Sequence, residues 1–321
     1  MNSFQDMWRD RGVRTWVSWI AVTPFAVWAA VRVSGFEPDW PWVPVVAFTP
    51  HAAVGAALSL ALAGLLRRWA AGAVALVTVL ALGAAVLPRA LPDRAPEPVA
   101  GGARLRVLAA NLLVGRADAV ELAGLVRSLR PDVLTLQEFT PLAKRRLEAA
   151  GLRELLPYAV TRPAEGAGGS AVYARHPLAA GDLIEQGGFG QATAVLTHPG
   201  GAQVEIVSVH PCAPKRVGRL RCWLAGLERL PRGGGRLRVL AGDFNATLDH
   251  LPVRELLAAG YRDAADAMGR GLSPTWGGWG PLPGVTIDHV LADGRMAVTD
   301  FRVLAPVGSD HRPVYAELLL P

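Results

Sequence analysis

Carboxylate, amide and imidazole side chains recur at five places in the last two-thirds of the chain. In sequence order they are Asn111, Glu138, His210, Asp243 with Asn245, and Asp288 with the Asp310–His311 pair. Each place lies at or just past the end of a short run rich in Val, Leu and Ile, which is typical of a buried strand. Strand ends are where α/β proteins gather polar groups from distant parts of the sequence. Carboxylates suit a hard divalent cation and histidines suit proton transfer or charge stabilisation, so the set predicts metal-assisted chemistry.

The apolar pattern predicts strands with helices between them. Expected strands cover 104–113, 133–137, 170–174, 192–197, 204–209, 237–240, 285–291, 297–304 and 314–319, and expected helices cover 117–130, 141–150, 216–229 and 253–259. Gly151 and Gly260 are natural stops for two of these helices. Most neighbouring strands would be antiparallel, which favours two packed sheets flanked by helices.

The wording and order of these motifs resemble a known superfamily. The motifs are LAANLL around Asn111, DVLTLQEF with Gln137 and Glu138, VLAGDFNAT, and the terminal GSDHRPVYAEL. Together they are similar to the endonuclease/exonuclease/phosphatase superfamily of DNase I-like proteins, over roughly Arg104 to Leu320. The resemblance implies a four-layer α/β/β/α sandwich of two packed mixed sheets across 104–321. It also implies a phosphodiesterase or phosphomonoesterase that depends on Mg²⁺, with Mn²⁺ as an alternative.

The resemblance assigns metal binding to three residues. In the family, the residue equivalent to Glu138 is the metal ligand, because hard oxygen ligands hold Mg²⁺ best. Asn111 would contact a metal-bound water or the phosphate. Asp310 would add a direct or more distant contact to the same cation.

Catalytic roles are expected for the remaining residues. Asp243 would orient or deprotonate a water while Asn245, on the same face of an extended segment, binds a phosphoryl oxygen; an Asx turn is the alternative for this pair. His311 would donate to the phosphoryl oxygen and stabilise the transition state. Asp288 would hold the His311 ring and keep it charged. His210 would assist the phosphate or the leaving oxygen.

Three apolar stretches precede this domain, at about 16–33, 43–66 and 69–87. Each is close to the roughly 20 residues that cross a bilayer, and none contains an acidic residue. A cleaved signal peptide would account for one stretch only, and helices of a soluble core would carry a polar face. We therefore expect a membrane domain at 1–88 with three transmembrane helices in the lipid bilayer.

Basic residues predict the orientation of these helices. Arg9, Arg11 and Arg14 precede the first stretch, and Arg67 and Arg68 join the second to the third. The positive-inside rule places both groups in the cytoplasm. Three crossings then give a multi-pass protein of the cell membrane with an extracytoplasmic catalytic domain. Residues 89–103, rich in Pro, Ala and Gly, would be an extended linker.

The cysteine content fits an oxidising compartment without requiring one. Cys212 and Cys222 are the only cysteines in the sequence, ten positions apart. In the cytosol they would be two unpaired thiols, whereas outside it a single local disulfide is natural.

The substrate is left open between nucleic acid, a phospholipid head group and a soluble phosphate ester. In the abasic-site endonuclease branch of the family a Tyr stands at the position of His210, whereas His there is similar to DNase I and to the sphingomyelinase-like branch. No protein partner is predicted. A non-catalytic protein that uses the same fold for binding is the alternative, and the intact catalytic set argues against it.

Charge and aromatic residues add two open questions about the site. The net charge is +6, yet part of it flanks the apolar stretches, so a nucleic-acid partner does not follow from charge alone. The cluster of Lys215, Arg216, Arg219 and Arg221 is either a solvated helix face or a phosphate-facing rim beside His210. Trp276 and Trp279 are candidate walls for the substrate, with loop packing as the alternative.

Overall fold

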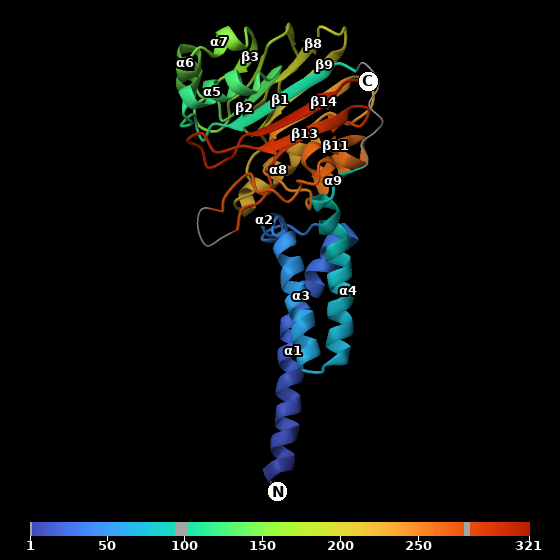
Figure 1. The fold of residues 1–321 in the computed structure, drawn as a ribbon. Helices are drawn as coiled ribbons and strands as arrows, with labels where there is room; N and C mark the ends of the chain where they lie inside the picture. Colours follow the sequence, from blue (N-terminus) through green and yellow to red (C-terminus); the bar gives the residue numbers. More distant parts are fainter. Residues whose placement is uncertain (1, 94–101, 279–282) are drawn as a thin grey trace. The chain divides into compact units, whose positions relative to one another are not determined.

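The chain divides into two compact units, Met1–Pro88 and Arg89–Pro321. The computed structural model describes residues 2–93, 102–278 and 283–321 (Figure 1). The first unit is helical and the second contains the sheets.

The first unit consists of four helices: α1 (Asn2–Ser34), α2 (Trp42–Val46), α3 (Thr49–Leu65) and α4 (Trp69–Val86). They pack through small residues, with Ala52, Ala56, Ala63 and Ala75 all buried. A side chain at Gly55 would collide with the ring of Phe25, so this glycine allows α1 and α3 to approach closely. Small residues at such contacts are typical of helices that associate in lipid.

Two helices of this unit are long and apolar enough to cross a membrane, Arg11–Ser34 and Trp69–Ala90. The expected second crossing at 43–66 is divided, because α2 ends at Val46 and α3 begins at Thr49. Pro50 lies in the first turn of α3, where a residue without an N–H is tolerated, and this favours a new helix start there. The 17 residues of α3 span about 25 Å, short of a bilayer core of about 30 Å. Length and composition of this kind also occur in buried core helices and signal sequences.

The second unit contains two six-stranded mixed sheets. The first has the order β13-β14-β1-β2-β4-β3, and the second has the order β11-β12-β10-β9-β8-β5. In each sheet one central pair is parallel, β1 with β2 and β9 with β10, while the other pairs are antiparallel. The bounds of the first sheet are β1 (Arg104–Asn111), β2 (Val133–Gln137), β3 (Tyr158–Arg162), β4 (Ser170–Ala174), β13 (Ala297–Val303) and β14 (Val314–Leu319). Those of the second are β5 (Leu178–Ala180), β8 (Thr193–Thr197), β9 (Gln203–Val209), β10 (Leu237–Asp243), β11 (Tyr261–Asp263) and β12 (Asp288–Asp293).

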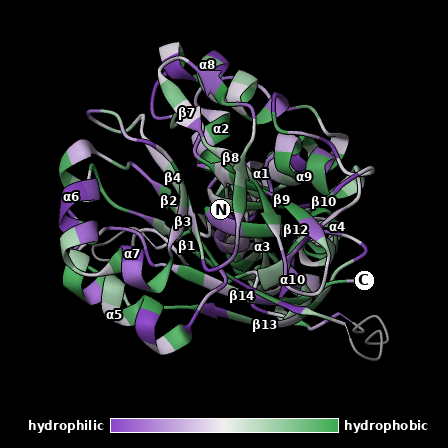
Figure 2. Cartoon of the chain, turned by 90° about the horizontal axis from the view of Figure 1, so that it is seen from above, coloured by the Kyte–Doolittle hydropathy of each residue, from purple (hydrophilic) through white to green (hydrophobic). Residues whose placement is uncertain are grey.

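Alternating side chains of β1 show why the sheets form layers. Leu105, Val107 and Ala109 point into the core between the two sheets, while Leu108 and Ala110 face a second core beneath the helices. The helices on this outer face are α5 (Ala119–Leu129), α6 (Pro141–Ala149) and α7 (Leu152–Leu155) (Figure 2). Helices α8 (Val217–Glu228) and α9 (Leu251–Ala258) contact each other beside the second sheet, and α10 (Ala264–Ala267) follows β11. The four-layer α/β/β/α sandwich is therefore confirmed.

The structure corrects several element boundaries. Strand β12 begins at Asp288, three residues later than the apolar run at 285, because Val285 pairs instead with Trp276. Five short strands and two helices of four residues were not expected, since segments of three to five residues carry too little periodicity to detect. A hairpin of β6 (Ile184–Gln186) and β7 (Phe189–Gln191) is among them.

The first residues of the expected linker belong to the second unit. Arg89 is buried and donates two hydrogen bonds of 2.7 Å to the carboxylate of Asp249. Asp93 N donates to Ala267 O at 2.9 Å, and Pro92 pairs with Met268. Arg89 lies in the short 3-10 helix η1 (Leu87–Ala90). Residues 94–101 of the linker lie outside the described residues.

Candidate active site

The carboxyl ends of the two parallel strand pairs bring the polar residues together. Asn111 ends β1 and is in register with Gln137 at the end of β2, so Glu138 follows directly. In the other sheet, His210 follows β9 and Asp243 ends β10. Parallel neighbours end at the same edge of a sheet, so residues more than 100 positions apart in sequence meet at one place.

Antiparallel strands complete the same edge from their amino ends. Asp288 begins β12 directly opposite Asp243. The Asp310–His311 pair lies in the segment before β14, which runs antiparallel to β1. The candidate metal-binding and catalytic residues of the motifs are therefore located at or near one edge.

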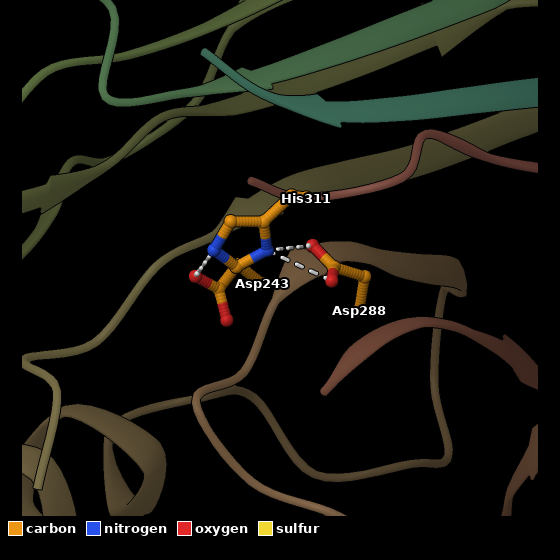
Figure 3. Close-up of side chains that lie close together, drawn as sticks. All are labelled: Asp243, Asp288 and His311. Atoms are coloured by element: carbon orange, nitrogen blue, oxygen red, sulfur yellow. Dashed lines mark hydrogen bonds and ion pairs between the residues drawn. The ribbon is translucent and has the colours of Figure 1, made fainter. Parts of the chain in front are cut away.

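His311 lies between two carboxylates (Figure 3). Its Nδ1 is 2.9 Å from Asp288 Oδ2 and 3.1 Å from Asp288 Oδ1, and its Nε2 is 3.7 Å from Asp243 Oδ2. Burial alone would lower the pKa of His311, but the charges of Asp288 and Asp243 outweigh it and raise the pKa to about 10. The ring is therefore a cation at neutral pH, held by one carboxylate and facing another.

Asp243 is the carboxylate on which most contacts converge. Its Oδ2 accepts a hydrogen bond of 2.9 Å from Asn111 Nδ2 and lies 3.6 Å from His210 Nε2. Burial raises the pKa of Asp243 above its ordinary value, although the neighbouring imidazoles oppose the shift. A carboxylate with a raised pKa is a stronger base.

Asn245 is brought to Asp243 by a turn and not by the pleat of a strand. Strand β10 ends at Asp243, and Asn245 has a left-handed backbone with φ of 49°. Asp243 Oδ1 accepts from Asn245 N at 2.8 Å, which is an Asx turn, and Asn245 Nδ2 donates to Pro211 O at 3.2 Å. The expectation of an extended segment was wrong for this reason, while the two side chains still lie in contact, with Nδ2 3.4 Å from Asp243 Oδ2.

Glu138 also has a left-handed backbone, with φ of 55°, which turns its carboxylate back toward the end of β1. Its Oε2 accepts a hydrogen bond of 2.5 Å from Val114 N. Its Oε1 lies 3.4 Å from Asn111 Nδ2 and 3.7 Å from His210 Nε2. The Asn111 amide oxygen accepts from Leu113 N at 2.9 Å, so the amide nitrogen points to Glu138 and Asp243.

His210 is buried and faces both carboxylates. Its backbone N–H donates to Gln191 Oε1 at 3.1 Å, and its ring packs edge-on against Phe189 with centroids 5.4 Å apart. Burial lowers the pKa of His210, and the charge of Asp243 only partly offsets this. The two histidines therefore differ in protonation state at neutral pH, with His311 charged and His210 neutral.

Asp310 is linked to the site through Trp276. The indole Nε1 donates to Asp310 Oδ2 at 3.0 Å, and the Trp276 and His311 rings lie with centroids 6.4 Å apart. Asp310 Oδ1 is 4.0 Å from His311 Nε2 and, within the described part of the chain, is a buried oxygen with no hydrogen-bond partner. Trp276 thus lies at the site, whereas Trp279 lies outside the described residues.

Three groups could offer ligand atoms to a cation. Asp243, Asp288 and His311 place such atoms within 4.8 Å of one another. However, a protonated imidazole has no lone pair for a metal, which argues against His311 as a ligand. Among the described residues, Glu138 Oε1 accepts a long hydrogen bond of 3.4 Å and Asp310 Oδ1 accepts none, and both are hard oxygens.

Two hydroxyl residues that the sequence did not reveal fix the geometry. Thr275 Oγ1 accepts from Asp288 N at 3.0 Å, and its carbonyl accepts from Arg312 N at 2.7 Å. Ser309 Oγ donates to Asn111 O at 2.8 Å and accepts from His311 N at 3.2 Å. Ser309 lies within the GSDHRPVYAEL motif and Thr275 directly precedes Trp276, yet a hydroxyl in a loop carries no signal of its own.

Gln137 acts between the sheets instead of at the catalytic edge. Its Nε2 donates to Ser208 Oγ at 2.9 Å, and the Ser208 hydroxyl donates to Leu136 O at 3.0 Å. Gly242 has φ of 145°, and a Cβ there would lie 2.6 Å from Gln137 Nε2. The glycine of the GDFN motif therefore leaves room for this contact between the sheets.

A two-sheet sandwich with this edge defines a hydrolase domain of the DNase I-like class. The chain belongs to the Endonuclease/Exonuclease/phosphatase family, which it matches over residues 108–311. The resemblance of the motifs is thereby confirmed. No curated protein sequence matches the chain.

Solved structures share the fold at low sequence identity. An endonuclease/exonuclease/phosphatase from Beutenbergia cavernae DSM 12333 is 21% identical with a TM-score of 0.53, covering 68% of this chain and 72% of that chain. A humanized TDP2 of D. rerio is 17% identical with a TM-score of 0.53, covering 67% and 98%. An AP endonuclease from Archaeoglobus fulgidus is 16% identical with a TM-score of 0.52, covering 66% and 98%.

Proposed function

We propose that the protein is a divalent-metal-dependent hydrolase of phosphate esters that acts by in-line attack of an activated water. The observation that carries this proposal is the contact of buried Asp243 with both imidazoles, one of which is held charged by Asp288. This arrangement pairs a base with a cation at a short distance, as attack on an anionic phosphate requires.

The residues present fit a divalent cation. Four carboxylates, those of Glu138, Asp243, Asp288 and Asp310, gather around His210 and His311. The buried Asp310 Oδ1, which accepts no hydrogen bond from the part of the chain that the structure describes, is an oxygen that a cation would satisfy. We propose that Glu138 and Asp310 hold Mg²⁺ or Mn²⁺, and that Asn111 orients Glu138 and the metal-bound water. When bound, the cation neutralises phosphoryl charge and orients the substrate.

Asp243 accepts the proton of the attacking water in this proposal. Its raised pKa suits a general base, and its hydrogen bonds from Asn111 Nδ2 and Asn245 N fix the direction of the carboxylate. Asn245 Nδ2 is close enough to the same carboxylate to donate to a phosphoryl oxygen beside it.

His311 and His210 stabilise developing negative charge. His311, a cation through its contact with Asp288, donates from Nε2 to a phosphoryl oxygen. His210, neutral through burial, donates a hydrogen bond to the phosphate or the leaving oxygen. Removing either ring leaves Asp243 with one fewer positive or polar neighbour.

Solved structures with the same fold bear on the class of substrate. A D. rerio TDP2 has been solved with a single-strand DNA product, and an AP endonuclease shares the fold. Nucleic acid, a phospholipid head group and a small phosphate ester are the candidates we carry forward.

We also propose that the first unit anchors the protein in a membrane with the second unit outside the cytoplasm. Two apolar helices of sufficient length support the anchor. The orientation further requires that α2 and α3 together make the return crossing, so that the Arg67–Arg68 turn lies in the cytoplasm. Cys212 and Cys222 are joined in a disulfide, which fits an oxidising compartment. Labelling intact cells with a membrane-impermeant reagent at a cysteine introduced by Arg262→Cys would test the orientation, and labelling only after lysis would contradict it.

Hydrolysis by the full chain in detergent tests the chemistry. We expect turnover of bis-nitrophenyl phosphate or nitrophenyl phosphate that requires Mg²⁺ and stops with EDTA. Asp243→Asn and His311→Ala should each lower kcat by about 100-fold or more, whereas Asp182→Asn, at an exposed position, should not. Equal turnover in all three variants would refute the mechanism, and binding without turnover would favour the non-catalytic alternative.

A further inference from the structure

The β6–β7 hairpin, the segment after His210 and helix α8 are joined to one another beside His210. We call these three elements the wall of the site. The β6–β7 hairpin carries Gln191, whose Oε1 accepts from His210 N at 3.1 Å and whose Nε2 donates to Gly226 O of α8 at 3.1 Å. The disulfide of Cys212 and Cys222 joins the segment after His210 to the same helix. Side chains at the start of α8 therefore keep a fixed position relative to the catalytic histidine.

A row of three side chains leads outward from the site. The His210 ring packs against Phe189, with centroids 5.4 Å apart, and Arg219 Cζ lies 5.8 Å from the Phe189 centroid. The Arg219 guanidinium and the His210 ring therefore both contact the ring of Phe189. A cation over an aromatic face is attracted to it, so Arg219 is oriented as well as placed nearby.

Three cations at this wall have no acidic partner. Within the described residues, Lys215, Arg216 and Arg219 make no ion pair with a carboxylate, whereas Arg89, Arg238, Arg295 and Arg302 all do. Lys215 lies in the segment between His210 and the start of α8, which the disulfide at Cys212 ties to that helix. We call Lys215, Arg216 and Arg219 the basic rim.

The start of α8 adds positive potential to the basic rim. Arg216 is the N-cap residue, makes no side-chain cap hydrogen bond, and no acidic residue lies in the first turn. Cations at a helix amino end are unfavourable by themselves, because the helix dipole is positive there. An anion at the rim would relieve this repulsion and would also be attracted by the side chains.

We propose that Lys215 and Arg219 form a subsite for a second anionic phosphoryl group of the substrate, next to the one that is hydrolysed. This rests on the proposed function, because it assigns the hydrolysed phosphate to Asp243, His210 and His311. The rim favours substrates with two phosphates and disfavours a cationic neighbour such as choline. The second phosphate could come from a nucleotide or from a phosphorylated head group, and both have the same recognition chemistry.

Binding to the EDTA-treated full chain in detergent tests this without turnover. The probes are an adenosine bisphosphate against adenosine monophosphate, and an inositol bisphosphate against inositol monophosphate, by isothermal titration calorimetry. We expect at least one bisphosphate to bind about tenfold more tightly than its monophosphate, as a charge-assisted contact predicts. Equal affinities within both pairs would overturn the subsite.

Charge variants identify the residues responsible. Lys215→Gln and Arg219→Gln should each reduce the bisphosphate preference to about threefold or less, because each removes one charge from the basic rim. Arg221→Gln is the matched control, since Arg221 is exposed on the same helix about 200° around from Arg219. A preference that survives both neutral variants, or that Arg221→Gln removes equally, would overturn the proposal.

The two proposals fail in different ways. Turnover of a one-phosphate ester without any bisphosphate preference leaves the hydrolase standing and removes the subsite. A bisphosphate preference that Lys215→Gln abolishes, in a protein that turns over no ester, leaves the subsite standing and removes the hydrolase.

Discussion

Asp288 Oδ2, at the start of β12, lies 2.9 Å from His311 Nδ1, in the segment before β14, so the contact joins elements attached to different sheets. This contact turns the other ring nitrogen toward Asp243 and keeps the ring charged. The pair therefore sets both the direction and the charge of His311, which is why its removal should affect rate and pH dependence together.

Replacing Asp288 by Asn should lower kcat by about 100-fold and shift the basic limb of the pH profile downward. The pKa of His311 is raised from 6.5 to about 10, so the ring of the folded protein is charged at neutral pH and loses its charge as pH rises through about 10. Without the Asp288 charge the loss should begin at lower pH. The pH dependence of kcat/KM for bis-nitrophenyl phosphate measures both effects.

The position of the basic limb in the pH profile tests whether the Asp288–His311 pair carries the charge. Asp300→Asn changes a carboxylate that pairs with Arg302 on the exposed part of β13 and serves as the control. A basic limb that stays in place in Asp288→Asn would mean that another group carries the charge.

Glu138→Gln should weaken Mg²⁺ activation by at least about tenfold, because a neutral amide is a poorer ligand for a hard cation than a carboxylate. The concentration of Mg²⁺ that gives half-maximal turnover measures this. Glu121→Gln, at an exposed position on α5, is the control and should leave that concentration unchanged. An unchanged Mg²⁺ requirement in Glu138→Gln would move the metal site elsewhere.

Arg89→Met should destabilise the unit Arg89–Pro321 by about 3 to 5 kcal/mol, because it breaks a buried ion pair and leaves Asp249 without this partner's two hydrogen bonds. Urea unfolding measures the loss. Arg302→Met, which breaks an exposed pair, should cost about 1 kcal/mol or less.

The same reasoning predicts that a fragment beginning at Arg104 is less stable than one beginning at Arg89. The double variant Arg89→Met with Asp249→Leu should recover part of the stability, since neither charge is then left buried. Equal urea midpoints for the two fragments would show that the pair contributes nothing.

Asp266→Asn should stabilise the second unit at pH 8 and have little effect below about pH 3.8, where Asp266 is protonated in both the folded and the unfolded chain. Burial first, and then the charge of Asp263, raise the pKa of Asp266 from 3.8 to about 6. Stability from the protonated form is full below about pH 3.8 and is lost as pH rises through about 6. The gain at pH 8 should be about 1 kcal/mol, because solvent screens a half-buried carboxyl. A gain that is the same at both pH values would reject this explanation.

Local patterns in the sequence predicted the long strands and most residues of the candidate site. Val, Leu and Ile runs predicted the long strands because each central strand is apolar on both faces, as in β1. The polar residues that follow these runs, such as Glu138 and Asp243, could be named because their type and order are visible without coordinates. Short strands such as β5 and β7 were missed because three residues show no period.

The tertiary structure alone decided which groups meet and what charge they carry. No sequence pattern places Asp243 between two imidazoles, positions Arg219 over Phe189, or pairs Arg89 with Asp249 across 160 positions of sequence. Those distances depend on strand register and on how the sheets pack, and the pKa values depend in turn on the distances and on burial. The sequence by itself determined the chemical groups and the strand ends that present them, because both follow from local composition. The structure determined their pairing, because pairing is a property of contacts between distant parts of the chain.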